Sequence, residues 1–403
     1  MEHTRMTLRL WERFQLFVLP MVVIAIFAFA GSAAWRLQTA PRTAPQDLVS
    51  LEGCFTHTEF TERIRCYRPM LEHHLDMHGP RAVLAALDRL QEQRTQFRAE
   101  CHTMAHILGR YWIASGKLLA DGFREGTNIC HSGFFHGMAE RVFQGEDASL
   151  DEPAHLSPEE LRARIATVCT DEALRTPSRN MRFQCLHGLG HAAVFSLSYD
   201  LLLALEMCDV LPTEWDQSSC AGGAFMENIT GMERDRRMLR AGDPHYPCSI
   251  VPSRHRKSCY GMQTSWMLES GMNWDAIIAA CRTAGDARLA CFQSFGRDVS
   301  PRVREKGPTE FVSLCTQLQP DERSPCIRGA VYALADHTWD GRYAFPFCAA
   351  FPDGALGHAC FTEAQRHLLY SLEQTRAATE QGCAALGTGR EACLQSLQTL
   401  ASS

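Results

Sequence analysis

The hydrophobic and polar positions of this chain follow the spacing of amphipathic helices, whereas the two-residue alternation typical of strands is scarce. One stretch shows the recurring pattern. A helical segment begins at Asn273 and runs through Cys281, a turn follows at Gly285, and a second helical segment runs through Cys291 to about Asp298. The pattern predicts an all-α fold built from helical hairpins.

The N-terminal pattern is different, because no charged residue occurs from Phe14 to Trp35. A helix of these 22 residues would be about 33 Å long, enough to cross the hydrocarbon core of a bilayer. The alternative is a cleaved signal peptide, since Ala28-Phe29-Ala30 resembles a cleavage site. We predict three N-terminal segments, namely a cytoplasmic N-terminus (1–13), a transmembrane signal-anchor (14–35) and a linker (36–50).

The composition of the chain is unusual in its number of cysteines. The 403 residues include 18 of them, and no two form a CxxC motif. An even number of widely spaced cysteines is typical of disulfides in an oxidising compartment. We therefore expect a single-pass membrane protein whose C-terminal domain is periplasmic or extracellular. The net charge of -6 gives no electrostatic reason to expect a nucleic-acid partner.

The cysteines fall into two types. Ten of them begin an apolar stretch, and seven of these ten have an arginine three residues earlier, as Arg182 precedes Cys185. The other eight lie 10 to 16 residues before a cysteine of the first type, near the end of a helical pattern. Each of the eight is expected to pair with its downstream neighbour, which leaves Cys101 and Cys130 to pair with each other. The predicted disulfides are 54–66, 101–130, 169–185, 208–220, 248–259, 281–291, 315–326, 348–360 and 383–393.

The cysteines also set a period. From Cys185 to Cys393, successive cysteines of the first type are 35, 39, 32, 35, 34 and 33 residues apart. A period of this length that contains two helical segments is typical of an αα-hairpin superhelix. We expect histidine-rich helical repeats at 51–200 and cysteine-stapled helical repeats at 201–403.

A hairpin of this length with an internal cysteine pair resembles the disulfide-stapled Sel1-like and tetratricopeptide-like repeat proteins. The resemblance covers residues 160–400 and is architectural, because the tetratricopeptide consensus of tryptophan, Leu-Gly and tyrosine is not present. It implies a scaffold for protein interactions and carries over no catalytic residue.

Histidines are concentrated early, since 12 of the 17 precede residue 200. Three cysteine segments carry many of them, CHTMAH (101–106), CHSGFFHG (130–137) and CLHGLGHA (185–192). Two pairs, His102 with His106 and His187 with His191, have the four-residue spacing that places both imidazoles on one helical face. A helix offers two nitrogens to one metal ion in this way in the HExxH zincins.

These segments predict a transition-metal site on the inner surface of the superhelix, with iron, copper or zinc as the ion. The alternative is that the imidazoles cap helices or form hydrogen bonds with the backbone. Glu227, seven residues after Cys220, is the candidate catalytic residue, as a ligand or a general base. His73, His74 and His78 are a second, separate set. The candidate metal ligands are His102, His106, His131, His136, His187 and His191.

Two functions fit these features. The first is a metalloenzyme, an oxidase, oxygenase or hydrolase whose ion activates dioxygen or water. The second is a non-catalytic scaffold that holds a protein partner at the membrane, which residues 240–400 favour because they lack the histidine pattern. The chain has no CxxCH, HExxH, GxSxG or GxxxxGK[ST] motif, so c-type haem, zincin, α/β-hydrolase and P-loop chemistry have no support.

Overall fold

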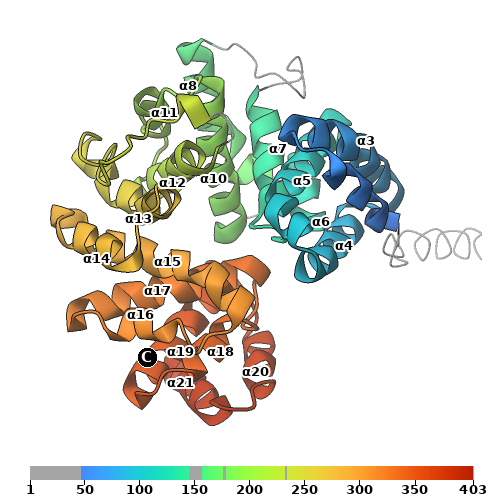
Figure 1. Ribbon diagram of the computed structural model, residues 1–403. Coiled ribbons are helices and arrows are strands. Elements are labelled where there is room, and N and C mark those ends of the chain that lie inside the picture. The colour runs from blue at the N-terminus through green and yellow to red at the C-terminus, as the bar shows by residue number, and fades with distance from the viewer. Residues whose placement is uncertain (1–46, 145–156, 176–177, 232–233, 403) are drawn as a thin grey trace, which may run out of the picture. The chain divides into compact units, whose positions relative to one another are not determined.

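Helices form the secondary structure of the computed structural model, which describes residues 47–144, 157–175, 178–231 and 234–402 (Figure 1). No strand occurs among these residues, so the predicted all-α fold is confirmed for the described part of the chain. The predicted signal-anchor at 14–35 lies outside the described residues. Of the helices that are described, none is long and apolar enough to cross a bilayer.

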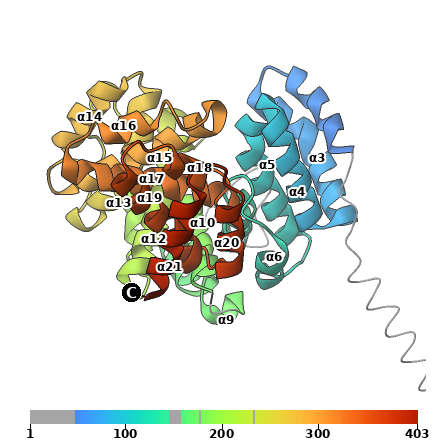
Figure 2. The ribbon, with the colours of Figure 1, turned by 90° about the horizontal axis from the view of Figure 1, so that it is seen from below.

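The first half of the described chain mixes long and short helices. Figure 2 shows α3, α4 and α5 side by side, and each of the three contacts the other two. The elements are η2 (Asp47–Thr56), α3 (Phe60–His78), α4 (Pro80–Gln93), α5 (Thr95–Ala114), α6 (Leu119–Glu125), α7 (Gly133–Gln144), α8 (Pro158–Val168), α9 (Asp171–Leu174), α10 (Arg179–Ser196), α11 (Leu201–Cys208), α12 (Glu214–Thr230) and η3 (Arg234–Arg236).

The second half is more regular, because a short helix alternates with a long one. The predicted hairpin at Asn273 corresponds to α14 and α15, although α15 continues to Lys306, beyond the predicted end at Asp298. The elements are α13 (Ser253–Glu269), α14 (Trp274–Arg282), η4 (Gly285–Ala287), α15 (Arg288–Lys306), α16 (Val312–Thr316), α17 (Pro320–Thr338), α18 (Ala344–Ala349), α19 (Gly354–Arg366), η5 (His367–Ser371), α20 (Arg376–Ala384) and α21 (Arg390–Ser402).

Polar residues mark where several helices begin. The side chain of Asn273 accepts a hydrogen bond from the Ala276 N–H at the start of α14. Ser157 and Glu160 form a reciprocal capping box at the start of α8, and Pro320 occupies the first position of α17. The first N–H groups of a helix have no partner within it, so these residues stabilise each start by about 1 kcal/mol.

All nine predicted disulfides are confirmed, and none of the 18 cysteines is free. Eight of them join residues 10 to 16 apart, as Cys281 of α14 is joined to Cys291 of α15. A bridge over so short a loop contributes about 3 kcal/mol, largely by restricting the unfolded chain. The ninth, Cys101–Cys130, joins residues 29 apart and links α5 to the turn before α7.

The long helices stack in sequence order, as a repeat superhelix requires. α5 packs on α7, α7 on α10, and α10 on α12, and the series continues through α13, α15, α17, α19 and α21 (Figure 1). Large apolar side chains such as Phe134, Phe225, Phe292 and Phe345 are fully buried between them. The fold therefore has the architecture of stapled helical repeats.

Hairpins far apart in the sequence also contact one another. The Asn128 carboxamide, before α7, lies 3.3 Å from the Asp336 carbonyl oxygen of α17. The Arg179 N–H at the start of α10 donates to Glu373 at 2.8 Å. In an open superhelix each repeat contacts only its neighbours, so these contacts add a long-range closure to the array.

Candidate metal centre

Five imidazoles from three neighbouring helices meet in one place, here called the histidine cluster. The centroids of contacting rings lie 4.5 to 6.4 Å apart. The structure thus brings together five of the six candidate ligands. The members are His102 and His106 of α5, His136 of α7, and His187 and His191 of α10.

The tightest part of the cluster is the group of His102, His106 and His136. One ring nitrogen from each of the three lies within 4.8 Å of the other two, and no other group of this kind occurs among the described residues. The Nε2 atoms of His102 and His106 are 3.0 Å apart. Two nitrogens bound to one tetrahedral zinc ion at about 2.0–2.1 Å would be about 3.3 Å apart, so the spacing fits a shared ion.

The hydrogen bonds of His102 and His106 define which nitrogen carries the proton. His102 Nδ1 is 2.8 Å from the Cys130 carbonyl oxygen, which can only accept, so Nδ1 is the donor. His106 Nδ1 likewise donates to the Glu140 carboxylate, 3.1 Å away. In the neutral rings, the lone pairs of the two Nε2 atoms therefore face each other. A metal ion or a proton between them relieves that repulsion.

His136 and His191 repeat this arrangement. The Gln184 amide oxygen lies 3.3 Å from His136 Nε2, and the Glu227 carboxylate lies 2.9 Å from His191 Nδ1. The second nitrogen of each ring is buried and has no hydrogen-bond partner. An unpaired buried acceptor is costly, and a bound cation satisfies it. The His191 ring contacts all three of the His102, His106 and His136 rings, with centroids 5.2 to 6.4 Å away, whereas His187 contacts only His136 among them, so His191 is the best placed fourth imidazole.

Burial lowers the pKa of three of these imidazoles, those of His102, His136 and His187. It is the main cause that lowers the pKa of His102 well below its ordinary value, with a further contribution from His106. It lowers the pKa of His136 in the same way, with help from His187. The pKa of His187 falls to about 3, from burial and then from His191. A neutral imidazole has the free lone pair that a metal ion needs.

Glycines allow the three helices to come this close. A Cβ atom at Gly137 of α7 would lie 2.2 Å from the His106 carbonyl oxygen. A Cβ atom at Gly188 of α10 would lie 2.8 Å from the Ala139 Cβ atom. Both positions are closer than real Cβ atoms approach, so only glycine fits. The glycines among the histidines thus determine the distance between the imidazoles.

His131 is the candidate ligand that lies apart from the histidine cluster. Its ring centroid is 4.9 Å from that of His337 in α17. Residues 130–132 all have φ between 55° and 62°, and α7 begins only at Gly133. Cys130 therefore lies in a left-handed turn, whereas Cys101 lies inside a helix. His131 therefore precedes the helix, whereas His102 lies inside one, and its side chain is directed away from the histidine cluster.

Glu227, the candidate catalytic residue, contacts the cluster from outside. It accepts hydrogen bonds from His191 Nδ1 and, at 2.6 Å, from the Tyr199 hydroxyl.

Glu140 plays the same part for His106, because its carboxylate accepts a hydrogen bond from His106 Nδ1. Glu140 was not predicted from the sequence. It lies four residues after His136 on α7, a spacing that identifies it in retrospect. A carboxylate that accepts from the outer nitrogen of a histidine orients the ring toward a metal.

Neighbouring side chains keep the Glu140 carboxyl ionised. Burial alone would raise the pKa of this carboxyl, but Arg110 and His106 outweigh burial and hold the pKa below its usual range. Arg110 lies 2.7 Å from the carboxylate. Glu140 is therefore an ionised acceptor that fixes the proton of His106 on Nδ1.

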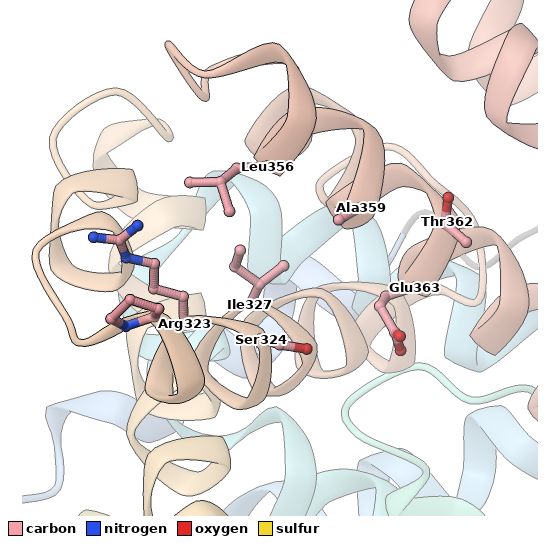
Figure 3. Close-up of a pocket in the computed structure, with 8 residues that line it drawn as sticks. Arg323, Ser324, Ile327, Leu356, Ala359, Thr362 and Glu363 are labelled. Atoms are coloured by element: carbon pink, nitrogen blue, oxygen red, sulfur yellow. The ribbon is translucent and has the colours of Figure 1, made fainter.

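Two other features are less suited to bind an ion. His73, His74 and His78 share α3, but their ring nitrogens do not gather within 4.8 Å of one another as those of His102, His106 and His136 do. The groove between α17 and α19 in Figure 3 has one carboxylate, Glu363, which accepts hydrogen bonds from Arg328 and Tyr332. The groove is lined by Pro320, Arg323, Ser324, Ile327, Leu356, Ala359, Thr362 and Glu363.

No protein-family model, curated protein sequence or solved structure matches this chain. The histidine cluster and the disulfides are therefore the features from which a function can be inferred.

Proposed function

We propose that this protein binds one transition-metal ion in the histidine cluster, with His102, His106 and His136 as ligands and His191 as the fourth nitrogen. The observation that carries the proposal is the pair of facing Nε2 atoms, 3.0 Å apart, whose rings have both Nδ1 atoms engaged by acceptors. The buried, unpartnered nitrogens of His136 and His191 support it.

The ligand set favours zinc or copper over iron. All four proposed ligands are imidazole nitrogens, which suit zinc and copper, whereas the open sites of non-haem iron oxygenases include a carboxylate ligand. Here the nearby carboxylates, Glu140 and Glu227, contact the outer nitrogens instead. We assign both of them an orienting role, which replaces ligation as the proposed role of Glu227.

The nine disulfides support an oxidising compartment, outside the cytoplasm, for this function. With the predicted signal-anchor at 14–35, we propose that the metal-binding repeats stand on the outer side of a membrane. A partner protein on the helical surface is compatible with this role and is a separate hypothesis.

Metal analysis of the purified full-length chain tests the proposal. Inductively coupled plasma mass spectrometry should find one zinc or copper ion per chain. The His106→Ala variant should lose that ion, because the variant removes one of the two facing nitrogens. Wild-type protein without a stoichiometric transition metal, after incubation with zinc and with copper, would refute the proposal.

His131→Ala is the matched control. His131 was a candidate ligand on sequence grounds, but its ring contacts His337. The variant should keep the ion. Circular dichroism of both variants should match the wild type, so that metal loss is separated from unfolding.

A further inference from the structure

His187 and Met226 lie at the edge of the histidine cluster and face each other. His187 Nε2 is 3.3 Å from the Met226 sulfur atom, which comes from the next long helix, α12. Both side chains are half-buried. His187 is therefore the member of the cluster with one nitrogen, Nε2, beside a sulfur atom, which is a second type of metal ligand.

The inner members of the cluster are shielded from solvent. His106, His136 and His191 are 8%, 3% and 1% exposed, so an ion that reaches them passes an outer residue first. The His187 ring is 5.1 Å from both His136 and His191. A single displacement of this length carries an ion from His187 to the inner ligands.

Gly222 and Phe183 flank the half-buried His187 ring. Gly222 lies next to the ring, and even a Cβ atom there would be 3.5 Å from Nδ1, an ordinary contact distance. Phe183 is 37% exposed, and its ring centroid lies 5.5 Å from that of His187. The glycine thus leaves space beside the imidazole, while the phenylalanine covers another face with an apolar group.

We propose that His187 and Met226 form an outer Cu(I) site through which copper reaches the histidine cluster. A thioether is a soft ligand that favours Cu(I) over Zn²⁺. One imidazole and one thioether bind Cu(I) without a change of oxidation state, so no reductant or oxidant is needed. This inference rests on the proposed function and adds the identity of the ion and its route.

The rate of copper uptake tests the route. Purified full-length protein is mixed anaerobically with Cu(I)–bicinchoninate, and the loss of colour follows the transfer of Cu(I) to the protein. Met226→Leu, which keeps the size and removes the sulfur, should slow the transfer about tenfold. The final copper content should equal that of the wild type, because the inner ligands are intact.

Two further variants make the result specific. His187→Gln should slow the transfer as Met226→Leu does, and it tests the site through the other ligand if the methionine variant does not fold. Met181→Leu on α10 is the matched control, since Met181 is also half-buried and lies outside the proposed site. Its uptake rate should be that of the wild type.

Two outcomes overturn the inference in different ways. Equal uptake rates for Met226→Leu and wild type would show that copper does not pass this site. Stoichiometric binding of zinc without any uptake of Cu(I) would refute the copper assignment and leave the proposed metal function standing. Failure to bind either ion would refute the proposed function itself.

Discussion

The helix pairs α10–α12 and α15–α17 have the same kind of backbone contact, in which a glycine of one helix packs against a carbonyl oxygen of the next. Gly190 of α10 and Gly296 of α15 each lie five residues after a cysteine of their own helix. A Cβ atom at Gly190 would be 2.0 Å from the Cys220 carbonyl oxygen, and one at Gly296 would be 1.9 Å from that of Cys326. The same close approach therefore occurs in both halves of the molecule.

The side chains next to these glycines differ. In α10 the next residue is His191, whose Nδ1 donates to Glu227. In α15 the next residue is Arg297, which donates to the Gly261 carbonyl oxygen, the Ser265 hydroxyl and the Asp298 carboxylate. Close helix packing is thus a general property of this repeat, and the residue after the glycine decides whether the contact adds a histidine to the cluster or an arginine to a structural hydrogen-bond network.

The largest expected effect comes from removing a disulfide in each half. Replacing Cys101 and Cys130 with alanine should destabilise the protein by about 3.6 kcal/mol, and replacing Cys383 and Cys393 by about 2.8 kcal/mol, because the first bond closes a longer loop. Denaturant unfolding measures both values. Only the first variant should lose metal, since the Cys130 carbonyl oxygen orients His102. Metal loss in the second variant would contradict the assignment of the site.

Alanine at one glycine of each helix pair tests the comparison directly. In the second pair this glycine is Gly329 of α17, which packs against the Gln293 carbonyl oxygen of α15. Gly190→Ala and Gly329→Ala should each cost about 3 kcal/mol, because a Cβ atom would lie 2.0 Å from the Cys220 carbonyl oxygen or 1.8 Å from that of Gln293. Thermal unfolding of both variants checks the cost. Gly190→Ala should also lower the metal content, whereas folded Gly329→Ala should keep it. Similar metal loss in both would mean that the two halves are not separate in function.

The carboxylates give a smaller, more local contrast. Glu140→Gln should weaken metal binding about 10- to 100-fold, because the neutral amide orients His106 less strongly. Glu363→Gln in α19 is the matched control, since Glu363 accepts from Arg328 and not from a histidine of the cluster. Competition with a chromophoric chelator measures both affinities. An unchanged affinity for Glu140→Gln would remove Glu140 from the site.

The last prediction concerns the pH dependence of stability, and it depends on His337 in the second half of the chain. Burial, and then His131 and Arg304, lower the pKa of His337 from 6.5 to about 2. Between these values the unfolded chain binds the proton and the folded chain does not, so stability falls as the pH falls below 6.5. The contribution of His337 is about 1.4 kcal/mol per pH unit at its steepest. Denaturant unfolding of metal-free His337→Gln between pH 6 and pH 4 should show a shallower slope than the wild type.

The disulfides and the helical fold could be predicted from the sequence because both depend on local spacing. A cysteine 10 to 16 residues before another, across a single turn, has its partner nearby once the two helices form. The same holds for His102 and His106, since their four-residue spacing alone places them on one face of α5. These features did not require knowledge of how the helices pack.

The composition of the site was decided by the tertiary structure. The left-handed turn at 130–132 separates His131 from His136, although the two are five residues apart in the sequence. Glu140 reaches His106 from a later turn of α7, and Tyr199 reaches Glu227 from the turn after α10; neither belongs to a cysteine segment. Local spacing sets which face of its own helix a side chain occupies. The distance between faces depends on how closely the backbones pack, and here the glycines of α7 and α10 set that distance.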